Sequence, residues 1–363
     1  MIADSSMTST IADRLESLRW LVGDTPLLAI RTRFCGQVIT VYAKHEVTNF
    51  TGSIKDRMAL HMLDDAHRSG AIQADGTIAE ATSGNTGISF SAIGRVLGHE
   101  VRIYMPDWMS QERVLLIQGL GAVVIPVSAE EGGFLGSIAK ADQFAEETEG
   151  VFRPQQFSSD ANVAAHYHST GPELLAQLGR MRKQPTAFVA GVGTGGTVMG
   201  VGRCLREALG SGVAIHPLEP ANSPTLRTGT KTGKHRIQGI SDEFIPALMK
   251  LDDIDEIVDV WDGDAILMAQ KLTKELGIAV GISSGANMIG ALRIAREQGR
   301  DAVVTTVFPD SNKKYLSTDL CSEEEMKDTY LTKDAELLDF RVVPRIGTGY
   351  GGLGESLPGQ ESS

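Results

Sequence analysis

Lys55 is the residue of this chain whose position most suggests covalent chemistry. It lies within Asn49–Arg57, at the start of an amphipathic helix that we predict over Asp56–Ser69. An ammonium group at a helix N-terminus faces the positive end of the helix dipole and therefore loses its proton more easily. A neutral lysine amine is the nucleophile that Schiff-base chemistry requires. Considered alone, such a lysine is more often a solvated side chain beside Asp56 or Asp64, because most lysines are solvated.

A glycine-rich turn in the middle of the chain has the residues of a phosphate-binding site. Gly191–Thr197 reads GVGTGGT and lies between a predicted buried strand and a predicted helix. Its glycines let successive backbone amides converge, Thr194 and Thr197 add hydroxyl donors, and the helix N-terminus adds partial positive charge. The alternative is that the turn binds no ligand and its glycines only let the helix pack closely on the sheet. We favour the anion site.

The same turn also satisfies the GxGxxG pattern of dinucleotide-binding folds, through Gly191, Gly193 and Gly196. Glu219 ends the next predicted strand, where such folds place the acid that binds ribose. That motif usually occupies the first strand–helix turn of its domain, whereas this one lies in the middle of the chain. A nicotinamide-dependent dehydrogenase is therefore an alternative that this segment leaves open.

Two further turns place hydroxyl groups at predicted helix starts. Thr82–Gly87 reads TSGNTG, and its hydroxyls and helix-start amides form a site suited to a carboxylate. Asn85 adds a side-chain amide that can donate to a hydroxyl or phenolate oxygen. Capping needs one serine or threonine at this point, so we favour ligand binding. Gly281–Gly285 reads GISSG before the predicted helix Ala286–Arg296, and capping explains only one of its serines.

Short apolar runs that alternate with helical patterns must position these turns. This alternation indicates an α/β fold with parallel strands and crossover helices on both faces. A polar tail begins at Glu323–Glu325, and the glycine, serine and proline content from Gly347 onward suggests disorder. The predicted strands are Val38–Ala43, Thr77–Ala81, Val101–Met105, Ala122–Val127, Ala187–Val192, Ala214–Glu219, Glu256–Val260 and Ala302–Phe308.

The composition narrows the class of protein. The chain has 34 Lys and Arg against 46 Asp and Glu, a net charge of −12. That balance argues against nucleic-acid and membrane binding, because both need a basic surface. No stretch has the pattern of a transmembrane helix or secretion signal, and the three distant cysteines fit free thiols, so a cytoplasmic enzyme is expected. His166 and His168 have no third ligand in a metal motif, so no metal site is expected.

Taken together, these segments resemble the cysteine synthase and cystathionine β-synthase family of pyridoxal phosphate (PLP) enzymes, which have fold type II and are similar to the tryptophan synthase β chain. The resemblance runs in family order from about residue 20 to residue 320 and covers most of the chain. The matching segments are GDTPLL (23–28), SIKDR (53–57), TSGNTG (82–87), MPDWMSQER (105–113), QQF (155–157), HYHSTGPE (166–173), GVGTGGT (191–197), IQGI (237–240), FIP (244–246), GISSGAN (281–287) and KKYLSTDL (313–320).

The resemblance implies a role for each matched residue. Lys55 would form the Schiff base with the cofactor and then act as acid and base. Asn85 would contact the 3′-oxygen of the cofactor, and Ser283 would face its pyridine nitrogen. The residues implied for the phosphate are Gly193, Thr194, Gly195, Gly196 and Thr197. Those implied for the substrate, chiefly its α-carboxylate, are Thr82, Ser83, Gly84, Thr86, Gln156 and Gly239.

The implied reaction is β-replacement on an O-activated serine through an aminoacrylate. A neutral Ser283 does not hold the pyridine nitrogen protonated, which favours loss of a β-leaving group over transamination. Cysteine synthase activity, from O-acetylserine and sulfide to cysteine and acetate, fits best. Cystathionine synthesis from serine and homocysteine, or replacement by another thiol or amine, stays open.

The resemblance also implies an architecture of two domains, each a mostly parallel sheet flanked by helices. We expect a small domain over residues 49–155 that carries the carboxylate turn. The large PLP-binding domain takes residues 10–48 and 156–330, and residues 331–363 form a partly disordered C-terminal extension. A homodimer, and serine acetyltransferase as a partner, are expected from the family only.

One segment departs from the family pattern. Cysteine synthases usually read GIGAGFIP, whereas this chain has Asp242 and Glu243 in the segment 239–246. Two carboxylates at the mouth of the site would repel anionic nucleophiles and favour a co-substrate with an ammonium group. Both side chains could instead point to water, as exposed acids normally do.

Overall fold

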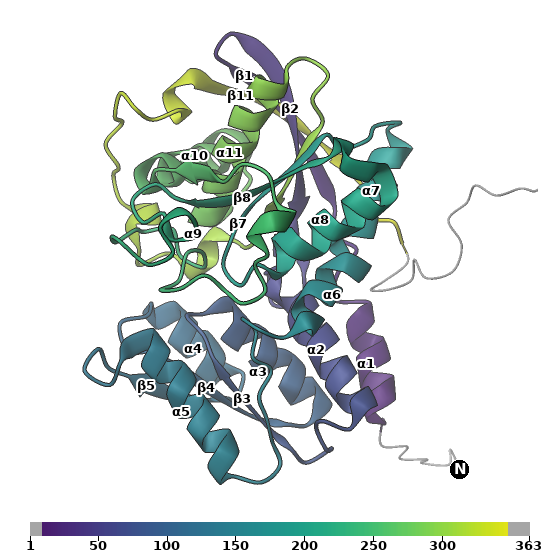
Figure 1. Ribbon diagram of the computed structural model, residues 1–363, viewed down its shortest axis with the longest axis vertical. Coiled ribbons are helices and arrows are strands. Elements are labelled where there is room, and N and C mark those ends of the chain that lie inside the picture. Colours follow the sequence, from purple (N-terminus) through teal and green to yellow (C-terminus); the bar gives the residue numbers. More distant parts are fainter. Residues whose placement is uncertain (1–8, 348–363) are drawn as a thin grey trace, which may run out of the picture.

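The computed structural model describes residues 9–347, which form two sheets with helices on both faces of each, so the predicted α/β class is confirmed (Figure 1). The helices are α1 (Ile11–Arg19), α2 (Lys55–Ser69), α3 (Asn85–Leu97), α4 (Gln111–Gly119), α5 (Gly133–Glu147), α6 (Asp160–His168), α7 (Thr170–Arg180), α8 (Gly196–Leu209), α9 (Thr225–Thr228), α10 (Asp262–Leu276) and α11 (Ile282–Gln298). The strands are β1 (Leu27–Phe34), β2 (Gln37–His45), β3 (Thr77–Ala81), β4 (Glu100–Pro106), β5 (Val123–Val127), β6 (Val151–Phe152), β7 (Ala187–Gly191), β8 (Ala214–Pro220), β9 (Val258–Val260), β10 (Val304–Phe308) and β11 (Ala335–Val343).

The larger sheet has seven strands in the order β11-β1-β2-β10-β7-β8-β9. Within this sheet β2, β10, β7, β8 and β9 pair in parallel with their neighbours, and β1 and β11 add an antiparallel edge. In β7, Val189 faces the core shared with α10 and α11, while Phe188 and Ala190 face the core shared with α7 and α8. Because side chains alternate between the two covered faces, such a strand is apolar at every position.

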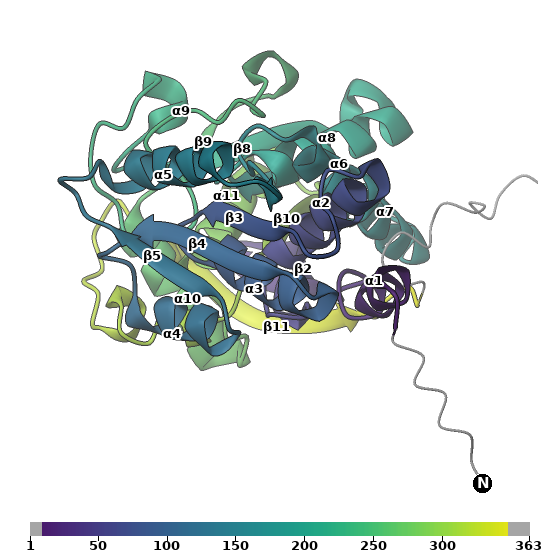
Figure 2. The same cartoon turned by 90° about the horizontal axis from the view of Figure 1, so that it is seen from below.

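The smaller sheet has four parallel strands in the order β5-β4-β3-β6. One face packs on α2, α3 and α4 through Ile78 and Ile103. The other face packs on α5 through small side chains, including Ala79 and Ala141. Figure 2 shows α4 and α5 on opposite sides of this sheet. The carboxyl end of β3 thereby carries the turn 82–87 toward the larger sheet.

All eight predicted strands are present, as β2 to β5 and β7 to β10. The C-terminal extension is more ordered than we expected, because β11 pairs with β1 along its whole length, from Leu27 opposite Val343 to Phe34 opposite Ala335. The polar sequence of β11 reflects an edge strand with several exposed side chains. The rest of the expected disordered tail, residues 348–363, lies outside the described residues.

Helix α1 packs with the smaller sheet. Leu15 and Leu18 lie in the same buried core as Met58 of α2 and Ile93 of α3. We expected residues 10–48 to belong to the larger domain; β1 and β2 lie in the larger sheet, whereas α1 packs with the helices of the smaller one. The division of the chain into two domains stays a proposal. Within residues 9–347, no helix is long and apolar enough to cross a membrane.

A buried network of charges joins the two sheets near the start of α2. The guanidinium of Arg57 donates to both carboxylates, Glu46 after β2 and Glu173 on α7. Lys44 of β2 contacts Glu173 at 2.7 Å. All four side chains are buried, and each charge has an opposite charge beside it, as the low polarity of a protein interior requires.

Candidate active site

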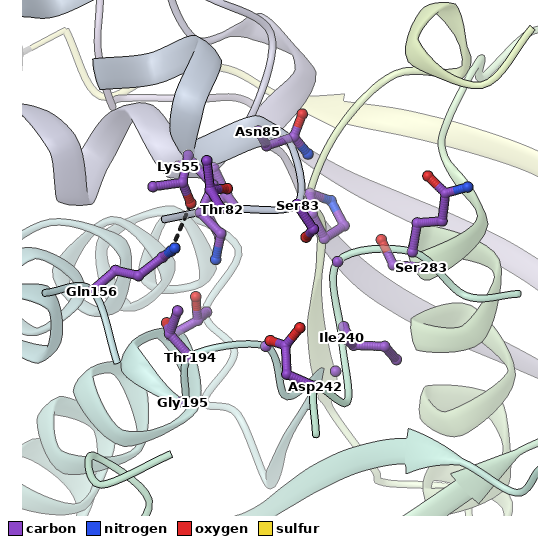
Figure 3. Close-up of a pocket in the computed structure, with 18 of the residues that line it drawn as sticks. Lys55, Thr82, Ser83, Asn85, Gln156, Thr194, Gly195, Ile240, Asp242 and Ser283 are labelled. Atoms are coloured by element: carbon purple, nitrogen blue, oxygen red, sulfur yellow. Dashed lines mark hydrogen bonds between the residues drawn. The ribbon is translucent and has the colours of Figure 1, made fainter. Parts of the chain in front are cut away.

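A cavity between the two sheets brings together most of the predicted site residues (Figure 3). Its walls come from the N-terminus of α2, the turns before α3 and α8, the loop 238–242 and the N-terminus of α11. Gly84 and Gly196 are not part of the lining, but each belongs to one of these turns. The predicted residues in the lining are Lys55, Thr82, Ser83, Asn85, Thr86, Gln156, Gly193, Thr194, Gly195, Thr197, Gly239 and Ser283.

Lys55 is the first residue of α2 and is half-buried in the cavity wall. The backbone amide of Ile54 donates to the carbonyl of Pro309 at 2.8 Å, which ties the start of the helix to the larger sheet. A Cβ atom on Gly193 would lie 4.0 Å from Lys55 Nζ. The amine is therefore held beside the turn 191–197.

The charge of Lys55 is set by its surroundings. Burial lowers the pKa of the Lys55 ammonium, and the carboxylates of Asp242 and Asp310 partly oppose that shift. A lowered pKa increases the fraction of neutral amine, which is the form that attacks a carbonyl. The structure therefore supports the chemical role that the helix position suggested.

Asp56 fixes the loop that leads to Lys55. Its carboxylate accepts hydrogen bonds of 2.6 Å from the backbone amide of Thr51, the hydroxyl of Thr51 and the hydroxyl of Ser89. A carboxylate in the first turn of a helix also interacts favourably with the helix dipole. These contacts hold the first turn of α2 against α3.

The backbone of Gly191–Thr197 forms a cradle of the kind that binds an anion. Gly195 has φ of 87°, a left-handed conformation that glycine adopts without steric cost. Helix α8 begins at the next residue, so its free amides are at the cavity. A Cβ atom on Gly193 would lie 2.5 Å from the carbonyl oxygen of Gly239. The lack of a side chain at Gly193 therefore lets the loop 238–242 approach this turn closely.

Two side chains behind the turn orient its hydroxyl groups. Asn162 Nδ2 donates to Thr194 Oγ1 at 2.8 Å, and His166 Nε2 lies 3.2 Å from Thr197 Oγ1. His166 Nδ1 lies 2.9 Å from the hydroxyl of Thr170. Burial lowers the pKa of His166 well below its usual value, so the imidazole is neutral. Its contacts serve the glycine turn and explain why a histidine occupies this position.

The turn before α3 presents hydroxyls and amides at the opposite wall. Thr82 Oγ1 accepts from the amide of Gly84 at 3.0 Å, and Thr86 Oγ1 donates to Gln156 Oε1 at 2.7 Å. Gln156 Nε2 donates to the carbonyl of Ala81 at 2.9 Å. The predicted carboxylate-binding residues are thus brought together, with Gln156 held between the turn and β3.

Asn85 is oriented by two residues that the sequence did not single out. Its Oδ1 accepts from Lys314 Nζ at 2.9 Å, and its Nδ2 donates to Asp310 Oδ2 at 2.7 Å. Because an ammonium can only donate, Lys314 must face the oxygen of the Asn85 amide, and the amide nitrogen must face the other way. Tyr315 also donates to Asp310 Oδ2, at 2.5 Å. The only sequence signal for this group was the segment KKYLSTDL (313–320).

Ser283 is buried on the first turn of α11 and lines the cavity. Gly281, just before the helix, has no room for a side chain, because a Cβ atom there would lie 2.2 Å from Asp310 Oδ1. At position 283 the wall presents a neutral hydroxyl to the cavity.

The two acids of the unusual segment 239–246 face different surroundings. Asp242 lines the cavity and faces it in Figure 3, whereas Glu243 lies 3.6 Å from Lys231, an exposed residue. Burial raises the pKa of Asp242 to about 6, although Lys55 and Lys231 oppose the rise. Of the two acids expected at the mouth of the site, Asp242 therefore lies in the lining of the inner cavity and Glu243 does not. Both acids also line an outer cavity of about 370 Å³ that continues from the inner one.

Glu219, which would bind ribose if the chain were a dinucleotide-binding protein, is used for a structural hydrogen bond. Its Oε2 accepts a hydrogen bond of 2.6 Å from the backbone amide of Leu226, at the start of α9. It does not belong to the cavity lining. The position predicted for a ribose-binding acid is thus used to hold the segment after β8.

The residues present fit pyridoxal phosphate. The fit rests on the glycine turn at the N-terminus of α8, on the two hydroxyls beside it, and on an amine in the wall of the same cavity. Lys55 would hold the aldehyde carbon, Thr194 and Thr197 the phosphate, and Asn85 the ring oxygen. These individual roles remain predictions.

Comparisons with known proteins agree with this fit. A model of the family described as pyridoxal-phosphate dependent enzymes matches residues 19–310. Cysteine synthase from Staphylococcus aureus is 40% identical over 311 residues, which cover 86% of this chain and 98% of that protein. A probable cysteine synthase from Bacillus subtilis is 40% identical over 302 residues, 83% of this chain and 96% of the relative.

Solved structures extend the likeness to the fold. A hydrogen sulfide-producing enzyme from Fusobacterium nucleatum is 52% identical, with a TM-score of 0.89 over 92% of this chain and 99% of that one. A mutant of that enzyme, solved with an α-aminoacrylate intermediate, is 53% identical, with a TM-score of 0.87 over 90% of this chain and 97% of that one. The predicted fold type II and its cofactor are thereby confirmed. This chain belongs to the pyridoxal phosphate-dependent enzymes, among their cysteine synthase-like members.

Proposed function

We propose that this enzyme releases sulfide from cysteine by β-replacement, and that Asp242 takes the proton of the incoming nucleophile. The observation that carries this proposal is the carboxylate of Asp242 in the same cavity as the amine of Lys55. A base at this position suits a nucleophile that arrives neutral and must lose a proton.

The side chains of the cavity divide the remaining work. Bound pyridoxal phosphate supplies a sink for the electrons released when the Cα–H bond of an amino acid breaks. Lys55 takes that proton and returns one at the end. The turn 82–86 and Gln156 hold the α-carboxylate, which fixes the Cα–H bond near the amine of Lys55. The neutral hydroxyl of Ser283 favours loss of a β-substituent.

The bonds balance without an oxidant or reductant. The Cβ–S bond of cysteine breaks and the sulfur leaves with the bonding electrons as HS⁻. The nucleophile then forms a bond to Cβ, and its proton moves to Asp242. With water as the nucleophile, cysteine and water give serine and hydrogen sulfide. The reverse entry of HS⁻ is opposed by the negative charge of Asp242.

Two groups of relatives support different directions of this reaction. The hydrogen sulfide-producing enzyme, 52% identical, supports sulfide release. The cysteine synthases, 40% identical, favour the second candidate, in which O-acetylserine and sulfide give cysteine and acetate. Rates measured with cysteine alone, and with O-acetylserine plus sulfide, decide between them.

Asp242→Asn is expected to lower the rate of sulfide release from cysteine about 100-fold, because the amide cannot accept a proton. Sulfide is followed colorimetrically and the amino-acid product by mass spectrometry. Glu243→Gln is the matched control, since its carboxylate faces Lys231, and its rate should stay close to that of the wild type. Equal losses in both variants would contradict the assignment of Asp242.

The pH dependence gives an independent check of Asp242. Its carboxylate must be ionised to accept a proton, so sulfide release should rise with pH up to the Asp242 pKa of about 6 and then level off. In Asp242→Asn this step should disappear. A step that persists in the variant would assign the titration to another group.

A further inference from the structure

The guanidinium of Arg113, on the first turn of α4, is buried without a carboxylate partner. Only 3% of the residue is exposed, and no ion pair of Arg113 occurs among residues 9–347. Its Nε has no hydrogen-bond partner, although NH1 donates to Gln238 Oε1 and the group stacks on the ring of Tyr315, 5.0 Å from its centre. By contrast, the other buried arginine, Arg57, contacts two carboxylates. A buried positive charge is normally paired, so an anion is the missing partner.

Arg113 lies directly against the turn that would hold the substrate carboxylate. A Cβ atom on Gly84 would come within 2.4 Å of Arg113 Cδ and 2.5 Å of Arg113 Nε. The absence of a side chain at position 84 is therefore what lets the arginine lie against the backbone of this turn. The residue also lines both the inner cavity and the outer one, at the boundary between them.

The turn itself offers only uncharged donors to a carboxylate. Thr82, Ser83 and Thr86 supply hydroxyls, and Gln156 supplies an amide. Of the nearby ammonium groups, that of Lys314 donates to Asn85 Oδ1, and that of Lys55 is committed to the cofactor in the proposed reaction. A guanidinium presents a planar fork of donors that matches a carboxylate, and such charged hydrogen bonds are about twice as strong as neutral ones.

We propose that Arg113 binds the α-carboxylate of the amino-acid substrate, which makes it a specificity-determining residue for the reaction proposed above. When substrate enters, the guanidinium exchanges the amide oxygen of Gln238 for a carboxylate oxygen and uses its free Nε. Arg113 lies on α4, which packs on the smaller sheet, and Gln238 lies in the loop between β8 and β9 of the larger sheet. The exchange therefore also changes a contact between the two halves of the structure. The inference rests on the proposed function for the identity of the substrate.

The test compares substrates that differ only in the carboxylate. L-Cysteine and L-cysteinamide carry the same thiol and amine, but the second has a neutral amide in place of the carboxylate. In Arg113→Met, kcat/KM for L-cysteine should fall about 10- to 100-fold, mainly through KM, while kcat/KM for L-cysteinamide should change little. Arg113→Lys, which keeps a charge without the fork, should recover part of the preference.

Gln238→Leu is the matched control, because it removes the partner of NH1 and leaves the guanidinium in place. Its preference for L-cysteine over L-cysteinamide should stay close to that of the wild type. If Arg113→Met loses both substrates equally, or if Gln238→Leu loses the preference as well, the arginine only supports the structure and the proposal is wrong. Retention of the cofactor absorption band shows that each variant is folded. If Arg113→Met does not fold, the comparison of the two substrates is made with Arg113→Lys instead.

Calorimetric binding of L-alanine and L-alaninamide separates this inference from the proposed function. Neither compound has a β-leaving group, so binding is measured on the holoenzyme without turnover. L-Alanine should bind about 10- to 100-fold more weakly to Arg113→Met than to the wild type, with little change for L-alaninamide. An enzyme that released no sulfide from cysteine would refute the proposed function and leave this result intact. Unchanged L-alanine affinity would refute the role of Arg113.

Discussion

Replacing Lys55 with alanine is expected to abolish β-replacement, with a loss of rate of at least about 10,000-fold. The amine has two tasks in the proposed reaction, since it attaches the cofactor and moves the proton of the substrate Cα. Alanine can do neither. Rates are measured with saturating pyridoxal phosphate and cysteine, so that weaker binding of the cofactor does not by itself account for the loss.

Borohydride reduction of the wild-type enzyme, followed by peptide mapping, should place a pyridoxyl adduct on Lys55. The adduct should be missing in Lys55→Ala and unchanged in Lys271→Ala, because Lys271 lies on α10 and does not line the cavity. An adduct on a different lysine of the wild type would remove the basis for the whole site.

Replacing Arg57 with methionine is expected to destabilise the fold by about 3–5 kcal/mol, because two buried carboxylates lose the guanidinium and Glu173 keeps only Lys44 as a charge partner. Glu46 and Glu173 both contact Arg57, and water cannot reach them to take its place. Denaturant unfolding of the holoenzyme measures the change. Arg57 lies two residues after Lys55 on α2, so the start of this helix should move as well, and activity should fall further than stability alone explains.

The control for Arg57 is Arg203→Met, which breaks an exposed pair with Glu207 on α8. Exposed pairs contribute at most about 1 kcal/mol, so its stability should stay near that of the wild type. Adding Glu173→Gln to Arg57→Met should restore part of the loss, because it removes one of the two buried carboxylates that have lost the guanidinium. Equal effects of Arg57→Met and Arg203→Met would show that the network contributes little.

The same network makes stability depend on pH in one direction. Burial alone would raise the pKa of Glu173, but Arg57 and Lys44 together hold it well below its usual range. A lowered folded-state pKa stabilises the fold at pH values above the unfolded value of about 4.3. That contribution should be lost as the pH falls toward the folded-state pKa, and Glu173→Gln should lose this part of the acid dependence.

The sequence predicted the parallel core of the fold because buried strands are continuous apolar runs. The strands it missed are those whose environment is set by pairing. In β1, Arg31 is exposed and follows four buried residues, so the run does not look like one strand. The turn to β2 consists of Cys35 and Gly36, with φ of 47° and 82°, a two-residue hairpin. Cys35 is therefore an exposed turn residue with a free thiol.

The candidate site was predictable where turns carry surplus polar residues, and the resemblance then joined these turns into one site. Asp310, Lys314 and Arg113 were missed because each acts through a partner distant in sequence, and no local pattern reveals such a partner. Asp242 was noticed only as a departure from the family, and whether it faced the cavity depended on packing. A homodimer and a serine acetyltransferase partner stay predictions from the resemblance.

The pairing of β1 with β11 has a consequence for how the chain is made. Leu27 pairs with Val343, so the seven-stranded sheet cannot close its antiparallel edge until the chain has left the ribosome beyond residue 343. The four-stranded sheet uses a continuous stretch, residues 77–152, and can assemble while synthesis is still under way. Because contacts between distant residues form slowly, closure of the larger sheet is the step that we expect to complete maturation of the newborn enzyme.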